Sequence, residues 1–175
     1  MKGNMNLFGP RLAGFDDPIE MLEACHERIE SQCDTLIRLV AHVRLAGADE
    51  SAIQAARAVM RYFDTAGVHH HDDEEQDLFP RLRKRSPDVG PLIDALNRDH
   101  EALSLHYGVV RAQLEALDGG RVMLQEADVV SLCEAYRAHI VRENAQVLPL
   151  ARTLLLPADV ALMGAAMARR RGSRS

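Results

Sequence analysis

The sequence has no tryptophan, few other aromatic residues and only three cysteines. Aromatic residues make up 4% of the 175 residues, so leucine, valine and alanine must fill the core. Cys25, Cys33 and Cys133 lack the short spacing of a zinc-binding pair, and their odd number does not suit a disulfide framework. We therefore expect reduced thiols that are buried as small apolar side chains.

Long apolar runs and an excess of positive charge are absent as well. No run approaches the roughly 20 apolar residues that span a bilayer, and the opening MKGNMNLFGP lacks the apolar core of a secretory signal. The 21 basic and 26 acidic residues give a net charge of −5, which argues against binding to nucleic acid or to an anionic membrane. The basic ending, Arg169-Arg170-Arg171 with Arg174, is typical of a solvated, frayed terminus. We expect a cytoplasmic protein.

Strand-like alternation of polar and apolar residues is also missing. Apolar residues instead recur at three- and four-residue spacing, which predicts helices buried along one stripe. The expected helices run from Asp17 to Gly47, from Asp49 past Phe79, between the breaks at 86–91 and 118–120, from near Asp128 onward, and for a short stretch after Pro157. Because short connections make neighbouring helices antiparallel, we expect one all-α domain over 1–175. It would be an up-down-up-down four-helix bundle over about 17–150 with a short C-terminal helix over about 158–170.

Histidine interrupts each of the four long apolar stripes once, and glutamate follows one turn later in the second and fourth. A single histidine on an apolar face is usually a satisfied core residue. Two buried glutamates, however, are costly unless something cationic lies between them. The pattern therefore predicts a metal site. Its candidate ligands are His26, His70, Glu74, His100, His139 and Glu143.

The run HHHDDEEQDLFP at 69–80 offers two pairs at four-residue spacing, His70 with Glu74 and His71 with Glu75. Helical steps back from His70 meet apolar residues, whereas steps back from His71 meet largely polar ones. We therefore expect His70 and Glu74 to face inward. The remaining polar residues are expected to form a solvated face, with a second metal site or a metal-loading patch as the alternative: His69, His71, Asp72, Asp73, Glu75 and Asp77.

The two halves of the chain repeat one design. Each supplies a single histidine from its first helix and a histidine-x3-glutamate pair from its second, and Pro80 and Pro149 each stand six positions after the glutamate. Four imidazoles and two carboxylates suit iron, manganese or zinc. If both glutamates bridge, two ions lie about 3.5 to 4 Å apart, each with two histidines. Such ions keep room for a bridging oxo or hydroxo group and one small exogenous molecule.

These motifs resemble the HHE cation-binding domains of the hemerythrin superfamily over about residues 17–170. The resemblance rests on four stretches: His26, His70-x3-Glu74-Glu75-x2-Leu78-Phe79-Pro80, His100-Glu101 and His139-x3-Glu143-Asn144. It implies a non-heme diiron centre, with ligand roles for the six candidates above. Four histidines with two bridging glutamates are most similar to the proteins for repair of iron centres. Ser104 and Asn144 stand where oxygen-carrying hemerythrins have a further histidine and an aspartate.

We expect a diiron-binding protein that senses or handles iron, oxygen or nitric oxide. The alternative is a diiron redox enzyme that reduces peroxide, oxygen or nitric oxide with help from Tyr136 or Cys33; whether the protein is an enzyme stays open. A third interpretation is a bundle whose metal is structural or absent. Zinc or manganese could replace iron, and a homodimer is one possible assembly. Tyr107 and Tyr136 are expected to pack in the core, while His42 and His106 receive no role.

Overall fold

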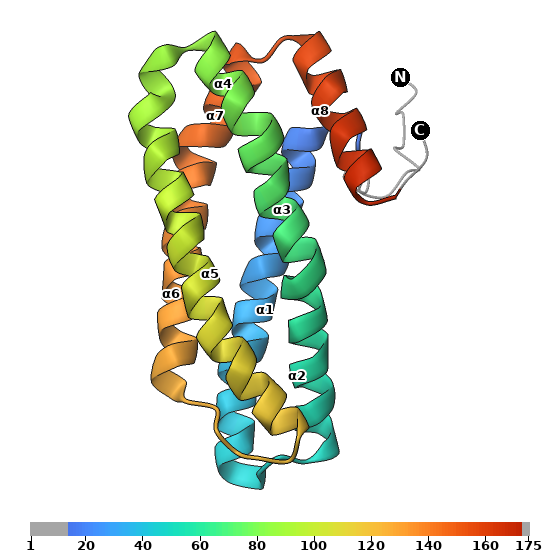
Figure 1. Ribbon diagram of the computed structural model, residues 1–175, viewed down its shortest axis with the longest axis vertical. Helices are drawn as coiled ribbons and strands as arrows, with labels where there is room; N and C mark the ends of the chain where they lie inside the picture. The colour runs from blue at the N-terminus through green and yellow to red at the C-terminus, as the bar shows by residue number, and fades with distance from the viewer. Residues whose placement is uncertain (1–13, 173–175) are drawn as a thin grey trace, which may run out of the picture.

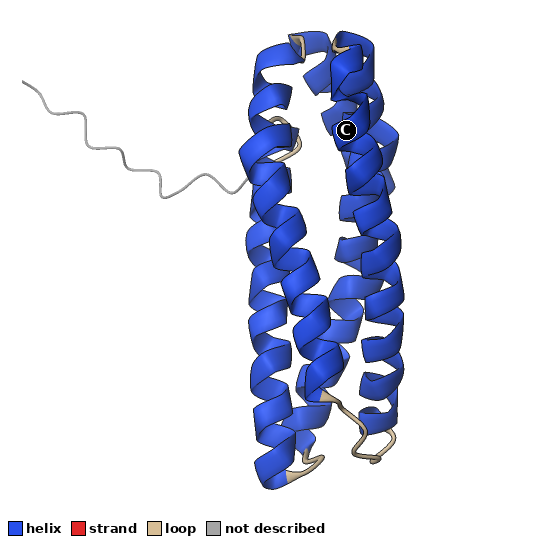
Figure 2. Cartoon of the chain, turned by 90° about the vertical axis from the view of Figure 1, so that its left-hand side faces the viewer, coloured by secondary structure: helices blue, strands red, loops and turns tan. Residues whose placement is uncertain are grey.

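The computed structural model describes residues 14–172, which form an all-α bundle without strands (Figures 1 and 2). The opening decapeptide and Arg174 lie outside these residues. The elements are α1 (Pro18–Ala46), α2 (Glu50–Tyr62), η1 (Phe63–Gly67), α3 (Val68–Asp73), η2 (Glu74–Leu78), α4 (Phe79–Arg85), η3 (Pro87–Val89), α5 (Gly90–Asp118), α6 (Glu126–Arg142), η4 (Glu143–Val147), α7 (Leu148–Leu154) and α8 (Pro157–Arg170). The predicted fold class is confirmed.

Four long helices account for most of these elements. The second is continuous from α2 to α4, and the fourth from α6 to α7. Helix α1 packs against α2 and α6, and α5 packs against the same two helices, so the four surround one axis (Figure 1). The first two helices start where the sequence predicts. The side chain of Asp17 accepts a hydrogen bond from the Glu20 amide at 2.9 Å, and that of Asp49 from the Ala52 amide at 2.8 Å.

Both glutamates of the histidine-x3-glutamate motifs begin a π-helical turn, η2 or η4. In each turn the backbone amide of the residue before the proline bonds the carbonyl five residues back: Phe79 to Glu74, and Leu148 to Glu143. The following proline lacks an amide hydrogen and its ring crowds the carbonyl four residues back, so a wider turn accommodates it. The repeated prolines thus mark a local widening of the helix at each glutamate, which the α-helical prediction did not include.

Two apolar clusters fill the bundle, one toward each end. One contains Ile29, Phe63, Leu103 and Ile140; the other contains Leu22, Leu78, Leu96 and Val147. On every long helix the inward position between these clusters carries histidine. The polar side chains therefore form a layer across the bundle with apolar packing on both sides, which keeps bulk water away from that layer.

The short helix α8 folds back and lies alongside α3 and α1 (Figure 1). Its Met163 and Met167 are fully buried. Gly164 faces the backbone of Phe15 so closely that an added Cβ would lie 2.0 Å from the carbonyl oxygen, so only glycine fits there. The short C-terminal helix is confirmed.

Part of the predicted frayed tail is instead paired. Arg170 donates to Asp73 and, at 2.8 Å, to Asp77, and Arg171 approaches Asp73 at 2.5 Å. Asp73 is 0% and Asp77 5% exposed, so the prediction that these aspartates lie on a solvated face is wrong. The pairing joins segments 97 residues apart, which is why local helical periodicity could not show it.

Among the described residues no single helix is long and apolar enough to cross a membrane. Segments Glu126–Leu154 and Pro157–Arg170 meet the length and composition criteria only as a pair, which is bent by 120°. The three cysteines are free and buried, as predicted.

Candidate metal centre

The six candidate ligands converge in the polar layer between the apolar clusters. Each of them is at most 3% exposed. His26 comes from α1, His70 from α3 and His100 from α5, while His139 lies in the last turn of α6. Glu74 and Glu143 enter from the π turns η2 and η4.

The side chains form two groups that share both glutamates. One group is His26, His70, Glu74 and Glu143; the other is Glu74, His100, His139 and Glu143. Within each group one potential ligand atom per residue lies within 4.8 Å of all the others. Because the glutamates are common to both groups, we name each half of the site by its two histidines: the His26–His70 half and the His100–His139 half.

Glu74 faces both halves with different oxygens. Its Oε1 lies 3.4 Å from Nε2 of His70, and its Oε2 lies 3.4 Å from Nε2 of His100. For Glu143 a single oxygen, Oε2, lies 3.0 Å from Nε2 of His26 and 3.2 Å from Nε2 of His139. Each carboxylate can therefore reach ions in both halves.

Several buried nitrogen and oxygen atoms in this layer have no hydrogen-bond partner. Nε2 of His26 lies close to the glutamate oxygens but without hydrogen-bond geometry. Nε2 of His100 and Nε2 of His139 lie 3.1 Å apart. Enclosed, unpaired polar atoms are costly. An ion in each half would explain these atoms, except Nδ1 of His70, which points away from Nε2 of the same ring, so the residues fit a metal centre. Among the six candidates the unpartnered atoms are Nε2 of His26, both ring nitrogens of His70, and both carboxylate oxygens of Glu74 and Glu143.

Without metal, protons on histidine balance the two glutamates. Burial lowers the pKa of His26, but the carboxylates of Glu143 and Glu74 outweigh this effect and raise it to about 10. For His100, burial again opposes charge, while Glu74, Glu143 and Glu75 raise the pKa to about 9. One protonated imidazole in each half therefore places positive charge beside the glutamates, and a bound metal ion would displace these protons.

The outer nitrogens of three histidines have partners that the sequence interpretation missed. His26 Nδ1 donates to Asn144 Oδ1 at 2.7 Å, and His100 Nδ1 donates to Glu75 Oε1 at 2.6 Å. Both partners directly follow a shared glutamate, so the motif contained a signal for them. Such partners fix the tautomer and direct Nε2 inward. Glu75 keeps 46% of its side chain exposed, so it lies at the surface as expected. It also orients the ring of His100.

His139 has a different outer partner. Its Nδ1 lies 3.4 Å from Oδ2 of Asp99, which also accepts a hydrogen bond from Arg142 at 2.6 Å. The His100–His139 half thus has a carboxylate behind each histidine. The His26–His70 half has a neutral amide behind one histidine and no partner for Nδ1 of the other.

Comparison with known proteins assigns this arrangement to a family. Residues 17–151 match the hemerythrin HHE cation binding domain. The chain belongs to the hemerythrin family. An uncharacterized protein from Haemophilus influenzae is 32% identical over 142 residues, which are 80% of this chain and 83% of that protein. The family and the clustered histidines and glutamates together indicate that the domain binds metal.

His71 of the hemerythrin domain also departs from the sequence prediction. His71 was expected on the solvated face, yet its Nε2 is enclosed and its ring stacks on His100 with centroids 4.0 Å apart. Burial, with repulsion from His100 and His139, lowers the pKa of His71 to about 3, so the ring is neutral. His71 lies one position after His70, about 100° further around the helix, so His70 faces His26 while His71 faces His100. His69 and Asp72 remain partly exposed.

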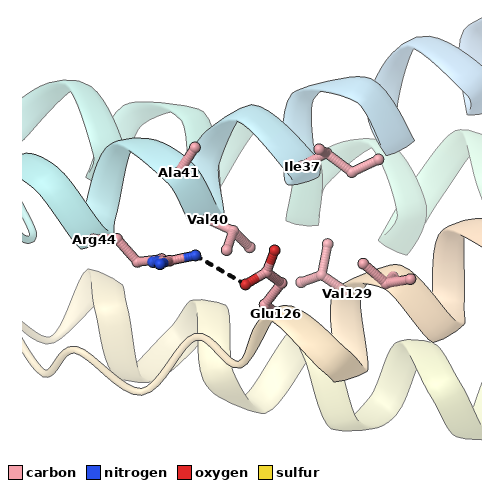
Figure 3. Close-up of a pocket in the computed structure, with 7 residues that line it drawn as sticks. Ile37, Val40, Ala41, Arg44, Glu126 and Val129 are labelled. Atoms are coloured by element: carbon pink, nitrogen blue, oxygen red, sulfur yellow. Dashed lines mark hydrogen bonds and ion pairs between the residues drawn. The ribbon is translucent and has the colours of Figure 1, made fainter.

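A cavity elsewhere in the hemerythrin domain is lined by none of the potential metal-binding groups. It has a volume of about 120 Å³ and opens between α1 and α6, where aliphatic side chains surround the Arg44–Glu126 ion pair of 3.0 Å (Figure 3). Ile37, its nearest lining residue on α1, follows His26 by eleven residues, or about 16 Å along the helix. This cavity is separate from the metal centre.

Proposed function

We propose that this hemerythrin domain binds two iron ions and senses or handles iron, oxygen or nitric oxide. The observation that carries the proposal is the sharing of Glu74 and Glu143 by two histidine pairs. One ion would explain only one pair, whereas two ions use all six side chains. The ligand roles of these six residues are part of the proposal.

The donor chemistry supports iron. Imidazole nitrogens and carboxylate oxygens suit iron, manganese and zinc, and the set contains no thiolate. Two adjacent iron ions supply one-electron redox chemistry and coordination positions for a small molecule such as oxygen, nitric oxide or peroxide. The protein's own contribution is to hold the ions with shared carboxylates, orient the imidazoles through their outer partners, and exclude bulk water with the two apolar clusters.

The two residues proposed as helpers of a redox enzyme are buried and protonated. Burial raises the pKa of Tyr136, which packs against Phe63 with ring centroids 5.3 Å apart. The hydrogen-bonded thiol of Cys133 and burial raise the pKa of the Cys33 thiol, which lies within an apolar cluster. Both groups therefore stay protonated at neutral pH, so a redox enzyme would use them as proton donors and not as bases.

The test is to purify the full chain without a histidine tag, quantify metals per chain and record absorption spectra in air and after anaerobic reduction. We expect two irons per chain and a charge-transfer band that bleaches on reduction. Zinc as the native metal, or one iron per chain, would contradict the proposal. Sustained consumption of peroxide, oxygen or nitric oxide with a reductant would indicate the enzyme instead.

A further inference from the structure

The His100–His139 half has an additional histidine beside it. One ring nitrogen each from His71, His100 and His139 lies within 4.8 Å of the other two, so these three residues form a third potential metal-binding group. His71 comes from α3, next to His70 in the sequence, but it approaches the opposite half of the centre. It thereby connects the second long helix to α5 and α6 at the level of the ions.

The nitrogen of His71 is enclosed although part of the ring remains accessible. Its Nε2 has no hydrogen-bond partner, whereas His42 pairs with Asp49 at 2.9 Å and His106 with Ser131 at 3.4 Å. A buried polar atom without a partner calls for an explanation, such as an ion. Packing alone would be served as well by an apolar ring, so stacking on His100 does not explain why this position carries imidazole.

We propose that His71 is a third imidazole ligand to the ion held by His100 and His139. This assignment rests on the two-ion centre proposed above. The two halves then differ in donor number, with three nitrogens in the His100–His139 half and two in the His26–His70 half. Because both halves share the same two carboxylates, the ion of the His26–His70 half keeps more free positions. Small exogenous molecules are then expected to bind at that ion.

The test is a titration of metal-free protein with Co(II) alone, followed by visible absorption. We expect wild type to bind two ions. His71→Gln should weaken binding of one of them roughly tenfold or more, because even the loss of an outer partner costs that much. It should also change the Co(II) ligand-field bands. His69→Gln is the matched control, since His69 is partly exposed on the same helix and outside every donor group. It should leave affinity and spectrum unchanged.

Two further measurements protect the test against a folding defect. Free imidazole should restore the wild-type spectrum of His71→Ala, because it can occupy the space that the side chain vacates. In Co(II)-loaded wild type, proton NMR should show five paramagnetically shifted histidine rings.

The outcomes separate the two proposals. Four shifted rings, or a His71→Gln variant with wild-type affinity and bands for both ions, would overturn the role of His71 and leave the two-ion centre standing. A wild type that binds fewer than two ions would overturn the centre itself.

Discussion

The His26–His70 half and the His100–His139 half use the same two glutamates, but their surroundings differ. Behind the histidines of the second half stand Glu75 and Asp99; behind those of the first stands only the amide of Asn144. Carboxylate partners make imidazole a stronger donor than a neutral amide does. An internally repeated design thus supplies equivalent ligands, while the residues around them make the halves chemically unequal.

The halves also differ at the residue before each glutamate. Asp73 is buried and is held by Arg170 and Arg171 of the C-terminal segment. Its counterpart, Arg142, keeps 37% of its side chain exposed and reaches Asp99. The C-terminal arginines therefore hold the residue before Glu74, whereas the residue before Glu143 pairs with Asp99.

The largest effect is expected from changing a shared glutamate. Glu74→Gln or Glu143→Gln removes a carboxylate from both halves, so each variant should lose affinity for both ions by roughly 100-fold. Elemental analysis after dialysis measures the metal content. Glu101→Gln, which changes an exposed carboxylate beside His100, is the control and should keep two ions. A glutamate variant that retains one ion at full affinity would show that its carboxylate serves only one half.

A smaller difference should separate His70→Ala from His139→Ala. The first leaves His26 alone in its half, whereas the second leaves His100 together with His71. The damaged half of His139→Ala should therefore bind Co(II) roughly tenfold more tightly than that of His70→Ala. Titration monitored by absorption compares them. Equal affinities of the two damaged halves would mean that the halves have the same number of nitrogen donors.

Removing the arginines at the C-terminal end of α8, Arg170 and its C-cap Arg171, tests the structural difference between the halves. The double variant Arg170→Ala/Arg171→Ala leaves Asp73 buried without a counter-charge, so the free energy of unfolding should fall by about 2–3 kcal/mol. Arg142→Ala breaks only a partly exposed pair and should cost less than about 1 kcal/mol. Urea unfolding of the metal-free proteins measures both. Similar small losses would show that the α8 pairing contributes no more than a surface ion pair.

Effects of about the same tenfold size as that between the histidine variants should come from exchanging the outer partners. Asn144→Asp places a carboxylate behind His26 and should tighten metal binding in that half by about tenfold, while Glu75→Gln should weaken the other half by a similar factor. Co(II) titrations of both variants, with the stability of each checked by thermal unfolding, provide the measurement. Two variants with unchanged affinities would remove the outer partners from the explanation of the asymmetry.

Helix boundaries and the six candidate ligands could be predicted because they follow from local rules. Asp17 and Asp49 cap helices through residues three positions away, and the inward stripe of a helix repeats at 3.6 residues per turn. The histidines interrupt that stripe at corresponding places in both halves. Two buried glutamates need a compensating charge, whichever distant residues pack around them. These expectations require no knowledge of which distant residues meet.

By itself the sequence determined the all-α bundle, the repeated histidine-x3-glutamate design and the level at which the polar layer crosses the core. Tertiary structure decided the position of His71, the pairing of Asp73 with the C-terminal arginines, and the partners of the imidazole rings. The reason is physical. Periodicity is a local property of one helix, whereas contacts between residues 97 positions apart exist only once the helices have packed.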